Sequence, residues 1–487
     1  MSPTIGPPPG SPAPPGGERP APRATSAHAP SGAPAKGGTI PIGSPGSAGE
    51  RPGAQGRPRV ARTDRLTTVW LCLAVLAAGA TTVFRKALPQ PLWTTIHLVT
   101  LGVLTNGILQ WSWYFARALL RLPPGDRHSG RDNTRRILAL NTALVVLIAS
   151  MWAEWAPGAV VGATGVGAVA AWHGLALVVA ARTRLASRFA VVLRYYAAAA
   201  AFLVLAAVLA GLVATAAFAA SAPQWLLGAR SAITVAHAIA GVGGWVGLTM
   251  GGTIVTLGPT AVRTRMDPRA VDLASLALPV WAAGLLAAVA GALAGHMRAV
   301  AAGLAVVGLA AAAGIAYPLA RAAMRKGPSE YGSWSMCLGT AWILVGVAVV
   351  AQHAWTTGTG EQLRAANLPW LPIIGAGGLG QVFIGALTYL MPVVIGGGPR
   401  AVRVGVGALE AAAPMREASR NAALVLLAAA TASQAPAAAP LATACWAVVL
   451  ATYLADIALM ARAGTAQARA RTAPPSPSPS NTGGPRG

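Results

Sequence analysis

Histidine is the residue type in this sequence that could carry chemistry. Of seven histidines, five lie inside or at the ends of long apolar segments, and His28 and His128 lie outside them. An ionisable side chain within a membrane is costly and usually functional. Because imidazole is also a common ligand of metal ions and haem iron, the five are candidate cofactor or metal ligands. They are His97, His173, His237, His296 and His353.

The apolar segments around these histidines predict an all-α, polytopic membrane protein. Hydrophobic residues make up 54% of the 487 residues, charged residues 10%, and the mean hydropathy is +0.56. About 20 apolar residues cross a bilayer as a helix, which satisfies its own backbone polar groups. We predict about twelve transmembrane helices: 66–84, 93–116, 134–153, 157–181, 190–220, 231–258, 271–295, 299–320, 334–354, 369–396, 420–434 and 440–461.

Pro-, Gly- and Ser-rich segments flank the predicted helices. Residues 1–63 and 464–487 have few large apolar side chains, so we expect disordered cytoplasmic tails on either side of a twelve-helix domain, residues 64–463. With the N-terminus inside, 32 of the 37 basic residues fall on the cytoplasmic side. This bias predicts both termini in the cytoplasm and the bacterial cytoplasmic (inner) membrane as the location. The net charge of +24 then lies in loops and tails, so we expect a lipid bilayer and no nucleic acid as partner.

The predicted topology places four of the five histidines in the outer third of the membrane. His173 alone lies near or below the midplane, where a helix–helix hydrogen bond is an equal alternative to a ligand role. His296 and His353 end their segments at the interface, which suits a histidine without any cofactor. His97 and His237 lie deeper, so we favour these two as ligands of a haem or metal near the outer face.

Glycines follow both favoured histidines. Gly102 follows His97, and Gly241, Gly243 and Gly244 follow His237. Such glycines permit close backbone approach or leave room for a flat cofactor.

Two predicted helices share a short sequence pattern. GTIVTLGPTAVR begins at Gly252 and GALTYLMP begins at Gly385, each with Leu at +5 and Pro at +7. The sixth and tenth helices are four apart, and the second, with His97, is four earlier. The pattern suggests a four-helix repeat, with common Gly and Pro usage in membrane helices as the alternative.

Other polar residues in the apolar segments are weaker candidates. Gln381 lies near the middle of the tenth helix and Asp456 near the inner end of the last, where hydration costs little. We find no paired carboxylates inside the predicted membrane region, which weighs against a proton-coupled pump.

Three stretches resemble bacterial membrane proteins labelled copper oxidase, which are NnrS-like and related to haem-copper oxidase subunit I. They are HLVTLGVLTNGILQWSWYFARALLR (97–121), AHAIAGVGGWVGLTMGGTIVTLGPTAVRTRM (236–266) and GQVFIGALTYLMPVVIGGGPRAVR (380–403). The resemblance covers most of residues 66–463. It implies a twelve-helix subunit I-like bundle, with His97 as a low-spin haem ligand and His237 as a copper ligand.

The chain departs from that family pattern at two helices. The pattern has a histidine pair in the seventh helix, where only His296 occurs, at the outer end. It has two histidines in the tenth, where Gln381 is the nearest polar residue. The resemblance therefore implies a haem b or copper site at His97 and His237, with His353 or His296, but no complete oxygen-reducing centre.

Three functions remain open from the sequence. The favoured one is an oxidoreductase-like protein in redox or nitric-oxide/copper handling, served by a separate cupredoxin or cytochrome electron partner. The alternatives are a non-redox transporter or channel and a structural scaffold derived from an oxidase.

Overall fold

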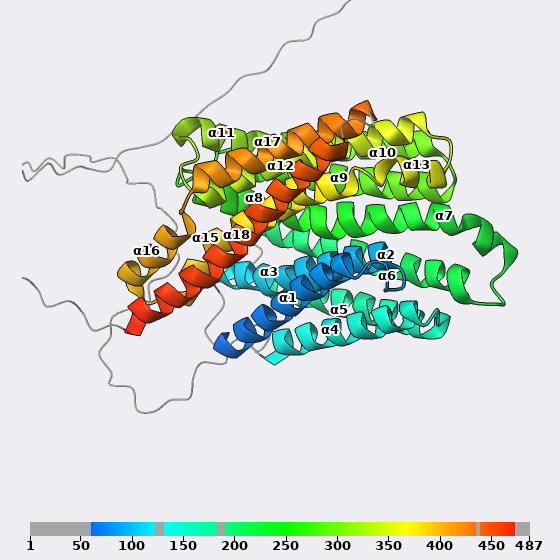
Figure 1. Cartoon of the computed structure of the whole chain (residues 1–487), viewed down its shortest axis with the longest axis horizontal. Coiled ribbons are helices and arrows are strands. Elements are labelled where there is room, and N and C mark those ends of the chain that lie inside the picture. The colour runs from blue at the N-terminus through cyan, green and yellow to red at the C-terminus, as the bar shows by residue number, and fades with distance from the viewer. Residues whose placement is uncertain (1–59, 122–130, 183–189, 435–438, 473–487) are drawn as a thin grey trace, which may run out of the picture. The chain divides into compact units, whose positions relative to one another are not determined.

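The structure, a computed structural model, describes residues 60–121, 131–182, 190–434 and 439–472, and every regular element in these ranges is a helix (Figure 1). His28 and His128 lie outside the described residues. The elements before the chain's midpoint are α1 (Val60–Val83), α2 (Pro91–His97), η1 (Leu98–Thr105), α3 (Asn106–Leu120), α4 (Arg131–Trp152), α5 (Ala156–Arg182), α6 (Ala190–Phe218), α7 (Gln224–Ala238), η2 (Ile239–Gly247) and α8 (Leu248–Ala261).

The second half continues in the same way. Its elements are α9 (Ala270–Leu293), α10 (Met297–Ala311), η3 (Ala312–Ala316), α11 (Tyr317–Lys326), α12 (Tyr331–Thr356), α13 (Gly360–Asn367), α14 (Leu371–Ile374), η4 (Gly375–Gly380), α15 (Gln381–Ile395), α16 (Gly398–Leu409), α17 (Ala413–Ser433) and α18 (Ala439–Thr472). The η elements are π-helical segments that join the α-helices on either side into single long helices.

Eleven continuous helices in the described part of the chain are long and apolar enough to cross a membrane, which confirms an all-α polytopic membrane bundle. The eleventh predicted helix, 420–434, is the exception. The structure begins this helix, α17, at Ala413, so that its first turns carry Arg416, Glu417 and Arg420. The sequence analysis had assigned these charges to a loop or to the helix boundary. With α17, the long helices number twelve in the described residues, in agreement with the prediction of about twelve.

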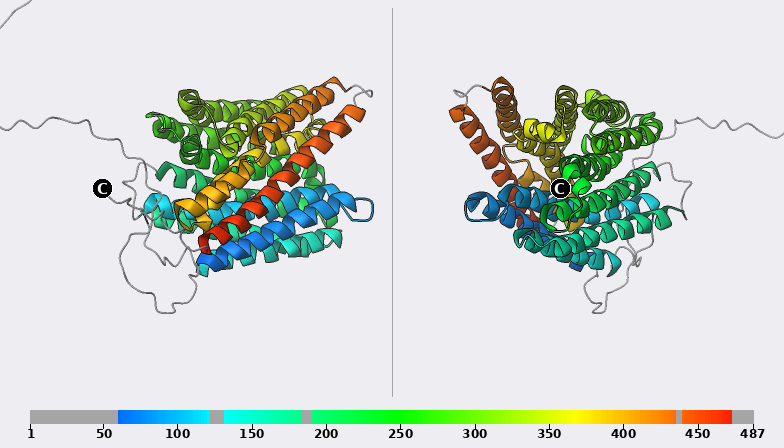
Figure 2. Two further views of the ribbon diagram at one scale, coloured as in Figure 1. Left: turned by 60° about the vertical axis from the view of Figure 1, so that its left-hand side comes forward. Right: turned by 90° about the vertical axis from the view of Figure 1, so that its right-hand side faces the viewer.

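The last helix also differs from its predicted length. We predicted 440–461 followed by a tail from residue 464, but α18 continues to Thr472. It runs obliquely across the other helices and lies beside α17 in both views of Figure 2. Helix α16 packs against the C-terminal part of α18, where Gly405 lies directly against the side chain of Gln467.

π-helical segments occur in all three helices of the predicted four-helix repeat. η1, η2 and η4 interrupt the second, sixth and tenth long helices, and η3 interrupts the eighth, which is not part of that repeat. A π-turn shifts the hydrogen-bond ladder by one residue and is often found at functional sites. In lipid, any backbone group that this shift leaves without a partner must be satisfied by the protein itself.

Two buried side-chain amides donate hydrogen bonds to carbonyl oxygens of these π-segments in the same way. Asn106 directly follows η1 and donates to the Gly102 carbonyl at 2.8 Å. Gln381 directly follows η4 and donates to the Gly377 carbonyl at 2.7 Å. Each donor is four residues after its acceptor, and each acceptor is a glycine inside the π-segment. The arrangement recurs in the second and tenth long helices but not in the sixth, where Leu248 follows η2.

Each amide also exchanges a pair of hydrogen bonds with an asparagine in the next long helix. Asn106 and Asn141 of α4 exchange hydrogen bonds of 3.0 and 2.8 Å. Gln381 and Asn421 of α17 exchange bonds of 3.1 and 3.0 Å. The pairs therefore tie the second long helix to the third and the tenth to the eleventh, again eight helices apart.

We predict that Asn106→Leu lowers the free energy of unfolding by about 1–3 kcal/mol, because it leaves the buried Oδ1 atom of Asn141 without its donor. The double variant Asn106→Leu/Asn141→Leu should cost less than the sum of the single variants, since both partners are then apolar. Thermal unfolding of the detergent-purified variants measures both effects. Additive losses would show that the amide pair is not coupled.

Candidate functional site: a facing histidine pair

The structure brings together the two histidines that the sequence analysis favoured. The ring of His97, at the end of α2, lies 6.2 Å from the ring of His237, in α7, measured between centroids. The two ring planes are nearly parallel, at 17°. The family resemblance assigns these residues to two separate centres, whereas the structure places their rings side by side.

Hydrogen bonds orient both imidazoles. The Nδ1 atom of His97 lies 2.8 Å from the Trp93 carbonyl oxygen, and the Nδ1 atom of His237 lies 2.8 Å from the Ala206 carbonyl oxygen. Because a carbonyl only accepts, both Nδ1 atoms must carry the proton, and the lone pair of each neutral ring is then on Nε2. No described residue hydrogen-bonds to either Nε2 atom. Metal-binding histidines are usually held by such an Nδ1–H bond to a second group.

Local packing reinforces this orientation. The indole of Trp93 stacks on the His97 ring with 4.1 Å between centroids and 24° between planes. Deeper in the bundle, the Trp245 indole N–H donates to the Thr105 hydroxyl at 2.9 Å. Trp245 belongs to η2 and Thr105 to η1, so this bond joins the π-segments of the two histidine-bearing helices. The spacing of the two imidazoles is therefore set by the bundle rather than by a flexible loop.

The spacing of the two rings can be compared with that of a centre with two imidazole ligands. Metal–imidazole nitrogen bonds are about 2.0 Å long, so a metal ion held end-on between two imidazoles would separate their centroids by about 6 Å. The observed 6.2 Å is close to this distance, although the two rings are stacked on each other. In the described part of the chain, no group of three or more His, Cys, Asp or Glu side chains could hold a metal ion. The site therefore offers two nitrogen ligands and no third side chain.

Three of the four glycines next to these histidines have a packing role instead of making room for a cofactor. A Cβ atom at Gly102 would collide with Ala74, one at Gly243 with Leu285, and one at Gly244 with Phe202. Gly241 alone has free space beside it, with Ala206 at ordinary contact distance. Close helix packing thus accounts for most of this glycine-rich pattern.

The other predicted site residues lie apart from the pair or have partners of their own. His353 contacts the Asn367 amide oxygen through Nδ1 at 2.9 Å, and His296 is exposed in the turn before α10. His173 is fully buried and its Nε2 lies 2.9 Å from the Ser112 hydroxyl, the helix–helix hydrogen bond that was the alternative to a ligand role. Gln381 donates a hydrogen bond to the Gly377 carbonyl oxygen in η4.

A second polar site was missed by the sequence analysis. Asp456 was expected near water, but its side chain is completely buried and forms ion pairs with both Arg416 and Arg420. The Tyr331 hydroxyl donates to the same carboxylate at 2.6 Å and accepts from Arg420 at 2.8 Å. The two arginines are i and i+4 on α17, so they share one face of that helix.

Further buried groups extend this cluster. Glu417 accepts hydrogen bonds from the Ser335 hydroxyl and from the Asn421 amide. The guanidinium of Arg416 lies 4.0 Å from the ring centroid of Tyr331, and that of Arg420 lies 4.1 Å from the ring centroid of Tyr453. Two arginines therefore face two carboxylates, of which Asp456 lies inside a predicted membrane segment and Glu417 lies just before one. The R-E-x-x-R spacing before an apolar run was the signal available in the sequence.

We predict that Asp456→Asn destabilises the protein by about 3–5 kcal/mol, because removing one partner of a buried ion pair leaves the other charges uncompensated. The matched control is Asp272→Asn, which changes an exposed carboxylate near the start of α9 and should have little effect. The measurement is thermal unfolding in detergent. Equal, small shifts in both variants would contradict a stabilising role for the cluster.

Comparisons of the sequence with protein families and with curated proteins found no match.

Proposed function

We propose that this chain is a membrane protein that binds a single redox centre, a haem b iron or a copper ion, between His97 and His237. The observation that carries the proposal is the facing imidazole pair, with both Nδ1 atoms bonded to carbonyl oxygens and both Nε2 atoms without a protein partner. The process it serves would be electron transfer or nitric-oxide/copper handling, with a separate cupredoxin or cytochrome as electron donor.

The number of ligands favours haem over copper. A haem iron receives four nitrogens from the porphyrin, so two imidazoles complete its coordination. A copper(II) ion prefers a tetragonal set of ligands, and the described residues offer no third side chain at the pair. Copper(I), for which two imidazoles can suffice, is the alternative. Either group, when bound, would supply one-electron redox chemistry.

The chain's own residues would hold and tune such a centre. The carbonyl oxygens of Trp93 and Ala206 fix the Nδ1–H tautomer and raise the basicity of Nε2. The stacked indole of Trp93 restricts rotation of the His97 ring.

The test is an absorption spectrum and metal analysis of the full-length protein, purified in detergent after expression with haem precursor and copper supplied. We expect a Soret band or bound copper, reduced at least tenfold in His97→Ala and in His237→Ala because each change removes half of the ligand set. His353→Ala and His296→Ala are the matched controls and should retain the cofactor. Wild-type protein without haem and without copper would refute the proposal.

A second candidate function is ion-coupled transport, which the buried charges of α17 and α18 favour. Charged groups inside a membrane bundle often mark ion or substrate pathways, and Glu417 has no ion pair at salt-bridge distance among the described residues. Solute flux into vesicles that is abolished by Glu417→Gln, in a protein that carries neither haem nor copper, would favour this reading. If variants at both His97 and His237 are indistinguishable from wild type, the scaffold alternative is favoured.

We also propose that both termini lie in the cytoplasm of a bacterial cell, with the protein in the inner membrane. Support comes from the 32 to 5 division of basic residues and from the twelve long helices of the described chain. Reporter fusions after residue 472 and after residue 357 should report opposite sides of the membrane. The same side for both would contradict this orientation.

A further inference from the structure

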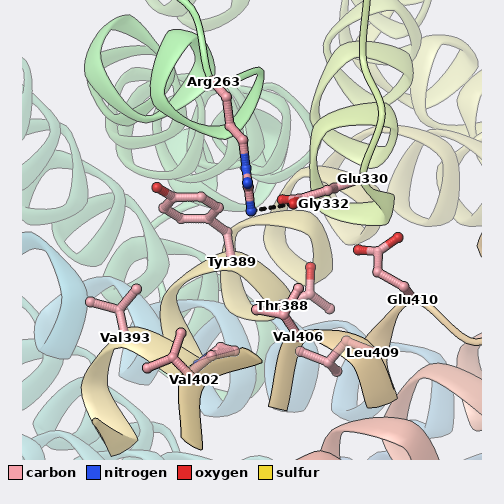
Figure 3. Close-up of a pocket in the computed structure, with 11 residues that line it drawn as sticks. Arg263, Glu330, Gly332, Thr388, Tyr389, Val393, Val402, Val406, Leu409 and Glu410 are labelled. Atoms are coloured by element: carbon pink, nitrogen blue, oxygen red, sulfur yellow. Dashed lines mark ion pairs between the residues drawn. The ribbon is translucent and has the colours of Figure 1, made fainter. Parts of the chain in front are cut away.

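A small cavity of about 200 Å³ lies between the end of α8, the start of α12, the second half of α15 and helix α16 (Figure 3). It is unrelated to the histidine pair, which lies on α2 and α7. One part of its wall is polar and the other is apolar. The polar residues are Arg263, Glu330, Thr388, Tyr389 and Glu410, and the apolar ones are Pro392, Val393, Val402, Val406 and Leu409.

The charges around the cavity do not cancel. Arg263 forms an ion pair with Glu330, drawn as a dashed line in Figure 3. Glu410 has no ion pair at salt-bridge distance among the described residues. With one guanidinium facing two carboxylates, the ionised wall has an excess of one negative charge.

Glu410 is held in place by the backbone. Both of its carboxylate oxygens accept the Tyr331 N–H, at 3.0 and 3.1 Å, at the start of α12. A carboxylate has about four acceptor positions, so one donor leaves most of its capacity unused. Burial is the main reason that the pKa of Glu410 is raised above its usual range, whereas the Tyr331 N–H and the charges of Arg416 and Arg263 act in the opposite direction.

We propose that this cavity binds a primary ammonium group, with Glu410 as its counter-ion and the apolar wall in contact with the attached carbon chain. An ammonium group carries three N–H donors, which suit a carboxylate with free acceptor positions. A divalent metal ion is a poorer match, because Glu330 is already paired with Arg263 and half of the wall is apolar. The proposal does not depend on the function of the histidine pair.

Two sources could supply this ammonium group. The cavity lies where membrane-spanning helices end, so the headgroup of an aminophospholipid is one source and a free small amine is the other. Their shared chemistry is an ammonium attached to a short carbon chain. The apolar residues on α16 would contact the glycerol or acyl portion of a lipid, whereas a free amine would leave them largely uncovered.

The experiment is thermal unfolding of full-length, detergent-purified protein titrated with ethanolamine, short-chain phosphatidylethanolamine or short-chain phosphatidylcholine. Phosphatidylethanolamine should raise the unfolding midpoint and phosphatidylcholine, whose ammonium has no N–H, should have a much weaker effect. A response to phosphatidylethanolamine alone identifies the lipid source, and an equal response to ethanolamine identifies a free amine. No response to either, or an equal response to phosphatidylcholine, would overturn the proposal.

Glu410→Gln keeps an acceptor for the Tyr331 N–H and removes the charge, so the apparent affinity should fall about tenfold or more. The matched control Glu361→Gln changes an exposed carboxylate on α13 and should respond like wild type. If Glu410→Gln does not fold, Val406→Phe decides the question by filling the cavity while keeping Glu410 and should abolish the response. If phosphatidylethanolamine or ethanolamine still raises the unfolding midpoint of the variant that is measured, Glu410→Gln or Val406→Phe, as much as that of wild type, the proposal is overturned.

Discussion

The arrangement of this bundle depends on one constraint: a backbone polar group in lipid must find its partner within the protein. An uninterrupted α-helix satisfies the constraint by itself, but the second, sixth and tenth long helices contain π-segments. Asn106 and Gln381 bond to carbonyls inside two of these segments and then to asparagines of neighbouring helices. The side chains that bond to the π-segment carbonyls therefore also hold neighbouring helices together. The histidine pair lies immediately before two of the π-segments.

Hydropathy and histidine placement were sufficient to predict the membrane bundle and to favour His97 and His237 over the other histidines. Both signals are local, since each depends on residues within one apolar segment. The convergence of the two imidazoles was not predictable from them, because it depends on how helices far apart in sequence rotate about their axes. A π-segment changes that rotation by one residue; the sequence of η1, LVTLGVLT, does not distinguish it from ordinary apolar helix, whereas η4, GAGGLG, is rich in glycine.

The buried ionic cluster shows the opposite failure. Hydropathy counts a charge as a cost wherever it occurs, so Arg416 and Arg420 were assigned to a loop and Asp456 to hydrated surface. All three side chains are buried, and the ion pairs between α17 and α18 compensate their charges. A partner forty or so residues away in sequence cannot be recognised from one sequence unless helix contacts are already known. The two readings of the glycines, close packing or room for a cofactor, could not be separated for a related reason: the sequence shows that a side chain is missing but not which neighbour takes its space.

The charges of α17 also bear on how the chain enters a membrane. A helix that begins with Arg416, Glu417 and Arg420 partitions poorly into lipid alone, because each charge carries a large insertion cost. The carboxylate of Asp456 that compensates the arginines is on α18, which is synthesised afterwards. We infer that α17 enters the bilayer together with α18, as a hairpin. The final step of biogenesis would thus be a paired insertion, although most of the earlier helices are apolar enough to enter singly.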